Sequence, residues 1–276
     1  MGCAVVVEGA DGAGLEAIER LFAERDAIFS RFRPGSELNR INRAAGTVVP
    51  ASAAFLRALR LALSAARATG GVVEPTLGAA VVAAGYDRDF ATLPADAPAA
   101  SPPPAADWRS VRAGARLLER PAGTVLDLNG IVKSLAVDDA LALLDAPGLV
   151  SAGGDLAVAG WPAFVALPGG ETVLLERGGL ATSGIATRSW RRGGETAHHL
   201  IDPATRLPSR SPWSFVSAVG ASCLTADVAA KAGFLLGADG PDWLDERGVA
   251  ARFVADGHVV CNETWRRSLE RERAAA

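Results

Sequence analysis

Short apolar segments separated by Gly and Pro fill residues 149–182, and this pattern strongly limits the folds open to the chain. Segments of this length between turn residues predict β-strands. Helices and strands come in runs along the sequence rather than in βαβα alternation, which favours an α+β fold over a doubly wound parallel sheet. We expect strands at 149–151, 155–159, 163–167, 172–175 and 180–182.

The rest of the chain shows helical periods and further strand segments. Apolar residues at helical spacing predict helices over 14–32, 51–69, 133–144 and 223–237. Further strands are expected at 3–8, 124–128, 214–219 and in a hairpin of 251–255 with 258–261. A Pro- and Ala-rich loop at 94–106 could hold an insertion or a lobe boundary, but no second core is cut off there, so 1–276 is interpreted as a single domain.

Composition and charge exclude several classes of protein. With 28 Lys and Arg against 31 Asp and Glu, the net charge of −3 gives no electrostatic reason to expect nucleic-acid binding. No uncharged apolar run is long enough to span a membrane, and the first residues lack the basic and apolar regions of a signal peptide. We therefore expect a cytoplasmic protein, and a membrane-anchored lipoprotein only if the start codon is mis-assigned.

The segment Asp127-Leu-Asn-Gly-Ile-Val-Lys-Ser134 runs through Gly130 into a predicted helix. Helix N-termini beside a Lys are natural anion sites, because free N–H groups and the ammonium face the same ligand. The spacing is not that of a Walker A loop. Phosphate binding and a simple capped turn both remain open for this segment.

Two further segments combine titratable residues. His198 and His199 are adjacent, so in a strand they point to opposite faces and are not expected to ligate one metal together. Asp227 and Lys231 are four residues apart and share one face of a helix. The apolar neighbours of this pair predict a buried helix, and a buried Asp and Lys without function would be costly.

The order of these segments resembles one family, the ApbE-type FAD:protein FMN transferases. The resemblance covers nearly the whole chain, and each motif is weak alone. It is carried by Met1-Gly2-Cys3, Phe29-Ser-Arg-Phe32, Ser36-Glu-Leu with Asn42, Thr69-Gly-Gly-Val-Val-Glu74-Pro-Thr-Leu-Gly78, Asp127-Leu-Asn-Gly-Ile-Val-Lys133, Gly153-Gly-Asp155, Ala181-Thr-Ser-Gly184, His199-Leu-Ile-Asp-Pro203 and Ala226-Asp227 with Leu235-Leu-Gly237.

The resemblance implies a two-lobed α+β fold with mixed or antiparallel sheets, packed helices and an FAD cleft between the lobes. It implies cleavage of the FAD pyrophosphate with Mg²⁺, attachment of FMN to a Thr of an acceptor protein, and release of AMP. FAD contacts are implied for Met1, Phe32, Val72, Val73, Glu74, Asp127, Lys133 and Ile201. Catalytic roles fall to His199, Asp227 and Lys231, and metal contacts to the Gly130 carbonyl and Asp227.

The sequence departs from the family pattern at two of these positions. Glu74 stands where the family usually has Asp, and Lys231 stands where the family has a metal-liganding Thr. A charged Lys donates hydrogen bonds and cannot coordinate a cation, which puts the Mg²⁺ requirement in doubt. Two alternatives therefore stay open beside the transferase: a non-catalytic FAD-binding module, and an FAD pyrophosphatase that yields FMN and AMP.

Overall fold

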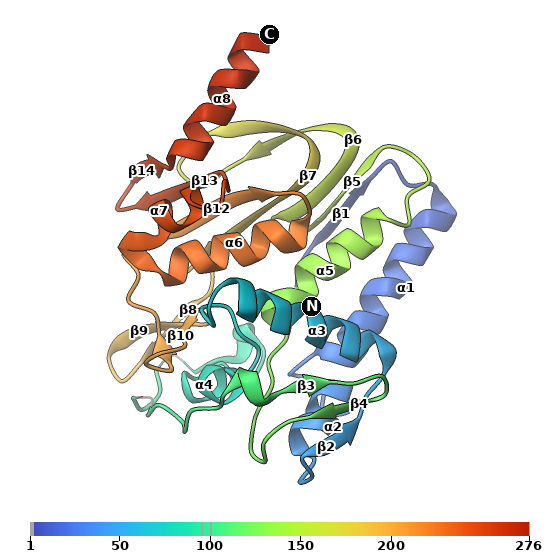
Figure 1. The fold of residues 1–276 in the computed structure, drawn as a ribbon, viewed down its shortest axis with the longest axis vertical. Coiled ribbons are helices and arrows are strands. Elements are labelled where there is room, and N and C mark those ends of the chain that lie inside the picture. The colour runs from blue at the N-terminus through green and yellow to red at the C-terminus, as the bar shows by residue number, and fades with distance from the viewer. Residues whose placement is uncertain (1–2, 95, 100, 276) are drawn as a thin grey trace. The chain divides into compact units, whose positions relative to one another are not determined.

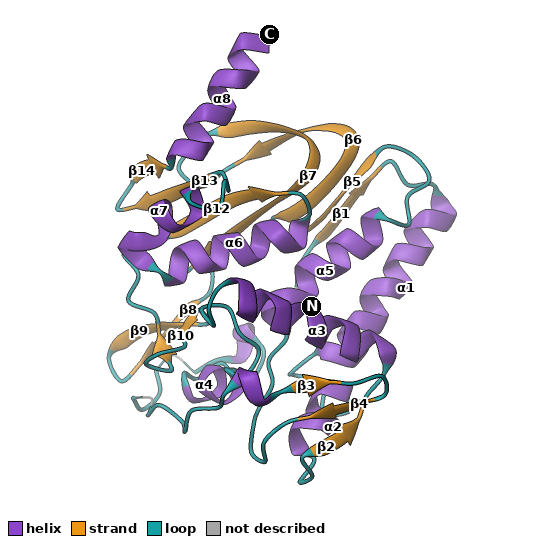
Figure 2. Cartoon of the chain, viewed as in Figure 1, coloured by secondary structure: helices purple, strands orange, loops and turns teal. Residues whose placement is uncertain are grey.

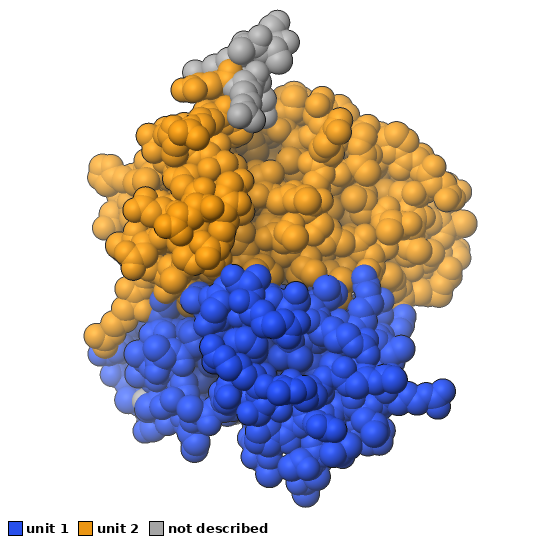
Figure 3. Space-filling view, viewed as in Figure 1, with its two compact units in different colours: residues 1, 22–132, 187–209 blue, residues 2–21, 133–186, 210–276 orange. Residues whose placement is uncertain are grey.

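The computed structural model describes residues 3–94, 96–99 and 101–275 of the chain (Figure 1). These residues form two compact units, coloured separately in Figure 3. Unit 1 comprises the described residues of 22–132 and 187–209, and unit 2 comprises those of 2–21, 133–186 and 210–276. The described residues of the loop 94–106 belong to unit 1. No helix in the described part of the chain has the length and apolar character needed to cross a membrane.

Unit 2 is built on a seven-stranded sheet in which every pair of neighbouring strands is antiparallel. The strand order is β1-β5-β6-β7-β12-β13-β14. The strands are β1 (Val5–Glu8), β5 (Gly148–Ala152), β6 (Asp155–Ala166), β7 (Thr172–Gly184), β12 (Phe215–Gly220), β13 (Ala251–Ala255) and β14 (His258–Cys261). Together with the helices seen in Figure 2, this sheet confirms the predicted α+β class.

The two central strands are longer than the sequence predicts. The segments 155–159 and 163–167 belong to the continuous strand β6, and 172–175 and 180–182 belong to β7. A register shift lies between Ala159 and Ala163, where Gly160 has a φ of 61° and Pro162 follows. A bulge accommodates such residues inside a strand, so the Gly and Pro that predict turns here mark a bend in the sheet.

Helices cover both faces of this sheet. Helix α6 (Cys223–Leu235) packs on β7 and β12, and Figure 1 shows α5 (Asn129–Leu141) beside it on the same face. The approach of α6 is close, because a Cβ on Gly179 of β7 would lie 2.2 Å from the backbone nitrogen of Cys223. On the opposite face, Trp265 of α8 (Glu263–Ala275) packs with Leu156 and Leu180.

Unit 2 also contains the start of α1 (Gly12–Phe29), a 3-10 turn and α7 (Gly240–Asp245). The carboxylate of Asp138 on α5 accepts hydrogen bonds from the backbone N–H groups of Cys223 and Leu224 at 2.8 and 2.9 Å. These contacts fix the first turn of α6 against α5. They complement the Ser222 cap, whose hydroxyl accepts from the Thr225 N–H.

Unit 1 combines short helices with three small sheets, all antiparallel. Its helices are α2 (Glu37–Arg43), α3 (Ala53–Ala68) and α4 (Gly78–Ala83), with short 3-10 turns at Phe90–Thr92 and Trp108–Ser110. Its strands are β2 (Val48–Pro50), β3 (Arg112–Ala113), β4 (Leu117–Glu119), β8 (Ser189–Arg192), β9 (Glu195–His198), β10 (Ile201–Asp202) and β11 (Leu207–Pro208).

The expected strand at 124–128 is wrong. This segment is extended but lies outside the sheets, because its backbone groups bond to loops and to a side chain. Asn42 donates to the Leu126 carbonyl and accepts from the Leu126 N–H, both at 2.9 Å. The Asp127 N–H donates to the Pro75 carbonyl at 2.9 Å. These partners satisfy the backbone without a second strand.

Candidate functional site

The first group of candidate residues follows α1, in the turn at residues 30–35 of unit 1. Asn39 on α2 holds this turn, because its side-chain amide donates to the carbonyls of Arg31 and Arg33, each at 2.8 Å. Ser36 caps α2 by accepting from the Asn39 N–H at 3.1 Å. The same short helix therefore caps itself and sets the conformation of the turn that carries Arg31 and Phe32.

Arg31 connects two of the predicted FAD contacts. Its Nε lies 3.2 Å from a carboxylate oxygen of Asp127, and both side chains are nearly buried, at 10% and 12% exposed. Its guanidinium lies over the rings of Phe32 and Tyr86, at 5.0 and 4.8 Å from their centroids. A planar cation can stack on aromatic faces and bind a carboxylate at once, which a Lys could not do in the same way.

An aromatic cluster extends from this arginine. Phe32 and Tyr86 meet edge to face at 5.4 Å, and Tyr86 and Trp190 lie 5.3 Å apart. Ile201 packs with Tyr86 in the same buried group, whereas the Phe32 side chain remains 37% exposed. Three of the predicted contacts, Phe32, Asp127 and Ile201, are therefore linked through Arg31 and Tyr86.

The segment 72–76 lies next to Asp127, through the Pro75 carbonyl that Asp127 bonds. Val73 is buried, and Val72 and Glu74 are half-buried. The Glu74 carboxylate accepts hydrogen bonds from the N–H and hydroxyl of Thr76 at 2.5 and 2.7 Å. Burial raises the pKa of Glu74 despite these bonds.

The two adjacent histidines have different surroundings. His198 ends β9, is 4% exposed and bonds the Ser209 carbonyl through Nε2 at 3.0 Å. Burial lowers its pKa, so it stays neutral near pH 7. His199 follows β9 and is half-buried. The His198 side chain is part of the packing of unit 1, while the role of His199 remains a prediction.

Two ion pairs with buried carboxylates form the second group of candidate residues, in unit 2. Lys133 Nζ on α5 lies 2.5 Å from a carboxylate oxygen of Asp155, at the start of β6. The other Asp155 oxygen accepts from the Thr182 N–H on β7 at 3.1 Å. Burial disfavours the Lys133 charge, but Asp155 and Asp227 outweigh it and raise the pKa of Lys133.

The second pair lies on α6 and confirms that Asp227 and Lys231 share one face of a helix. The Lys231 ammonium bonds Oδ1 of Asp227, and the hydroxyl of Ser134 donates to Oδ2 at 2.8 Å. The Asp227 side chain is 3% exposed and that of Lys231 is 15% exposed. Each carboxylate oxygen of Asp227 therefore has a partner within unit 2.

The side chains present do not fit the divalent metal that the resemblance implies. Mg²⁺ prefers a nearly ideal octahedron of oxygen ligands, usually with one or two carboxylates. Asp227 is engaged by an ammonium, and Gly130, on the first turn of α5 in unit 1, would offer only a carbonyl. Among the described residues, no three His, Cys, Asp or Glu side chains come together in a way that could hold a metal.

Sequence reasoning missed several residues that build these two groups. Arg31 lies inside the Phe29-Ser-Arg-Phe32 motif but has no predicted role, whereas Tyr86 and Trp190 belong to no motif and only the fold brings them to this motif. Asp155 stands in the Gly153-Gly-Asp155 motif and Ser134 ends the segment from Asp127, but neither has a predicted role in a site. A charged side chain in a strongly apolar stretch was the one usable signal for Asp155. Met1 lies outside the described residues.

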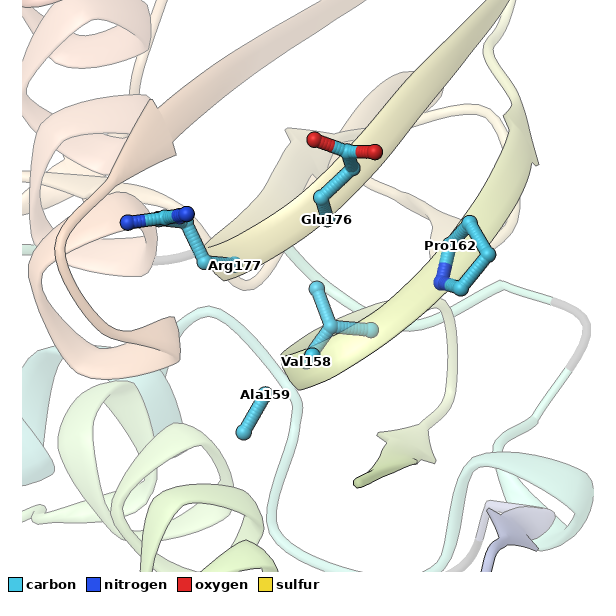
Figure 4. Close-up of a pocket in the computed structure, with 6 residues that line it drawn as sticks. Val158, Ala159, Pro162, Glu176 and Arg177 are labelled. Atoms are coloured by element: carbon cyan, nitrogen blue, oxygen red, sulfur yellow. The ribbon is translucent and has the colours of Figure 1, made fainter.

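A hollow of about 480 Å³ lies elsewhere in unit 2, at the bulge between β6 and β7. Figure 4 shows the lining side chains Val158, Pro162, Glu176 and Arg177 on these strands. None of the predicted site residues lines it. Its position agrees with the register shift between β6 and β7, which lies between Ala159 and Ala163.

Comparison with known proteins places the chain in a class. A solved ApbE protein structure from Thermotoga maritima superposes with a TM-score of 0.80, at 24% identity over 96% of this chain and 95% of that one. The flavin transferase ApbE from Vibrio cholerae gives a TM-score of 0.77, at 20% identity over 96% of both chains. These likenesses show that the chain has the fold of flavin transferase structures.

The family is shown by a sequence comparison. The model of the ApbE family matches residues 1–253, and the chain belongs to this family. A FAD:protein FMN transferase of Treponema pallidum (strain Nichols) is 29% identical over 259 residues, covering 82% of this chain and 72% of that protein. One of Chlamydia trachomatis serovar D is 29% identical over 262 residues, covering 88% and 82%.

Proposed function

We propose that the chain is a FAD:protein FMN transferase, which cleaves FAD and attaches FMN to a Thr of an acceptor protein. The observation that carries this proposal is the family match over residues 1–253, together with two curated relatives that both bear this name. The buried, charged side chains that the structure adds are suited to a phosphorylated ligand. Lysines and backbone N–H groups are common phosphate partners.

The reaction transfers the FMN group of FAD, with its phosphate, to a hydroxyl oxygen. The Thr hydroxyl oxygen forms a bond to the phosphorus on the riboflavin side, and the bond from that phosphorus to the bridging oxygen breaks. AMP leaves with the bridging oxygen, and the hydroxyl proton goes to a base. We assign this base to His199, because a neutral imidazole can accept a proton near pH 7.

The FAD contacts that the resemblance implies are part of this proposal. In unit 1, the aromatic edge at Phe32 and the apolar side chains of Val72, Val73 and Ile201 suit a flavin ring, while Asp127 and Glu74 supply acceptors. Arg31 keeps the Asp127 carboxylate in place through the 3.2 Å contact. In unit 2, Lys133 supplies a positive charge whose side chain is 32% exposed. Met1 completes this proposed set.

The Lys231 ammonium that binds Asp227 argues against a Mg²⁺ step at this carboxylate. We assign Lys231 to supplying positive charge to the pyrophosphate, and Asp227 to holding the Lys231 ammonium in place. Lys231 and Lys133 are then the cations that face the phosphates. This assignment makes Lys231 a catalytic residue in this chain, although the family carries a Thr at its position.

A mass measurement separates this function from its alternatives. The protein is incubated with FAD and a peptide that carries an acceptor Thr, and both the peptide and the released nucleotides are analysed. A peptide heavier by FMN, with AMP released, supports the transferase. AMP and FMN without a heavier peptide support an FAD pyrophosphatase. Intact FAD that copurifies with the protein supports a binding module.

A further inference from the structure

The chain contains only two lysines among its 28 basic residues, and the others are arginines. Both lysines, Lys133 and Lys231, belong to the ion pairs of unit 2. The exposed ion pairs, for example those with Glu16 and Asp87, are formed by arginines. The carboxylates that these two lysines bind are 2% and 3% exposed, whereas the Asp127 carboxylate that Arg31 binds is 12% exposed.

An ammonium and a guanidinium differ at such a place. The ammonium is a compact point charge with three donors, whereas the guanidinium is a wide planar fork. Gly153 lies beside Lys133, since a Cβ added to Gly153 would lie 3.8 Å from Nζ, an ordinary contact distance. An ammonium is compact, as a bound metal ion is.

The surroundings of Asp227 show what the Lys231 ammonium does. Its two oxygens bond Lys231 and Ser134, and its side chain is 3% exposed. A carboxylate can bind Mg²⁺ only through an oxygen that is free to coordinate. A metal at Asp227 would therefore have to displace the Lys231 ammonium and leave two cations close together, which Coulomb repulsion opposes.

We propose that Lys231 is a built-in cation that replaces the divalent metal at Asp227, so that the chain binds and cleaves FAD without Mg²⁺. Only the part of this inference that concerns FAD binding and cleavage rests on the proposed function. The ammonium gives one positive charge and donor protons to a phosphate, but it does not act as a Lewis acid. The chain thus performs the proposed reaction by charge and hydrogen bonding alone.

The two lysines allow a direct measurement on the native protein. Lysine labelled with ¹³C and ¹⁵N gives two side-chain signals in NMR spectra, assigned through Lys133→Arg and Lys231→Arg. We expect millimolar Mg²⁺ to leave the Lys231 signal of the free protein unchanged and FAD to shift it. Movement of the Lys231 signal to that of a solvated lysine on Mg²⁺ addition would overturn the proposal.

FAD binding tests the same idea independently. We expect the Kd for FAD to change less than about twofold between EDTA and Mg²⁺. A metal-dependent site would instead bind FAD at least ~10-fold more weakly in EDTA, a loss of 1.4 kcal/mol in binding free energy. A Kd that weakens ~10-fold in EDTA overturns the proposal. If the protein does not bind FAD at all, the proposed function fails, and the Mg²⁺ titration of the free protein still decides the cation question.

Two variants give a matched comparison. Lys231→Thr frees Asp227 and should create a Mg²⁺-dependent rise in Tm, while Lys231→Arg keeps a cation and should show no such rise. A Mg²⁺-dependent Tm in the native protein, equal to that of Lys231→Thr, contradicts the proposal. If Lys231→Thr does not fold because it leaves a buried charge unpaired, the NMR titration of the native protein remains the deciding result.

Discussion

The hydroxyl of Ser134 donates a hydrogen bond of 2.8 Å to Asp227, a residue 93 positions further along the chain. Both side chains are buried, so the bond links α5 to α6 inside unit 2. It fixes one carboxylate oxygen, and Lys231 fixes the other. The orientation of Asp227 therefore depends on both helices.

Removal of the Ser134 hydroxyl should destabilise the fold. Ser134→Ala leaves an oxygen of a buried carboxylate without its donor, which costs about 1–3 kcal/mol. Urea unfolding measures this as a lower midpoint with an unchanged slope. The control is Ser101→Ala at an exposed position, where we expect a change within about 0.5 kcal/mol. Equal stability of the two variants would contradict this role.

Close packing of α6 on the sheet makes Gly179 sensitive to substitution. In Gly179→Ala the new methyl would lie 2.2 Å from the Cys223 nitrogen and 2.4 Å from the Ser222 carbonyl carbon, so backbone has to move. We expect a loss of about 1–3 kcal/mol or more, as for other overpacked positions. Gly12→Ala, with nothing within 4 Å of its added Cβ, is the control. If Gly179→Ala lowered the free energy of unfolding less than Gly12→Ala does, the packing argument would be refuted.

The burial of His198 gives unit 1 a pH-dependent contribution to stability. Its folded pKa lies below the ordinary 6.5, so below about pH 6.5 the unfolded chain takes up a proton that the folded chain resists. The free energy of unfolding should therefore fall as the pH drops from 6.5 towards the folded pKa. This contribution is absent in His198→Gln.

The comparison uses urea unfolding of native protein and His198→Gln at about pH 7.5 and about pH 5.5. We expect the native protein to lose more stability than the variant over this interval. Other titrating groups are common to both proteins and cancel in the difference. An equal loss in both would mean that the native pKa of His198 is not lowered.

His199 is expected to act in transfer without a large part in FAD binding. His199→Ala should lower the transfer rate at least ~10²-fold, the scale of a positioned acid–base group, while the Kd for FAD stays within about threefold. His198→Gln provides the matched control, because its ring bonds the Ser209 carbonyl inside unit 1. Normal turnover of His199→Ala would remove this residue from the mechanism.

Much of the fold follows from local sequence features. The helices predicted over 51–69 and 223–237 are found as α3 and α6, because helical periodicity and the Ser52 and Ser222 caps act within one turn. The hairpin of 251–255 with 258–261 is likewise confirmed as β13 and β14, around a Gly257 whose φ is 80°. Such features depend on neighbours in the sequence alone.

Other features depend on residues that are distant in the sequence. The segment 124–128 has the composition of a strand, but Asn42 and Pro75 take its backbone hydrogen bonds. The Lys231 contact with Asp227 was predictable from i and i+4 spacing, whereas the partner of Lys133 was not, since Asp155 lies on another element. Helix α5 begins at Asn129, four residues before its predicted start, through the turn at Leu128.

The central claim is the transfer of the flavin-side phosphate, and isotope labelling follows it directly. Two FAD samples carry ³²P either on the riboflavin-side or on the adenosine-side phosphorus, and each is incubated with the protein and an acceptor-Thr peptide in EDTA. We expect the riboflavin-side label to become covalently attached to the peptide and the adenosine-side label to appear only in AMP. The account is contradicted if the adenosine-side label attaches to the peptide, or if the riboflavin-side label is found only in free FMN.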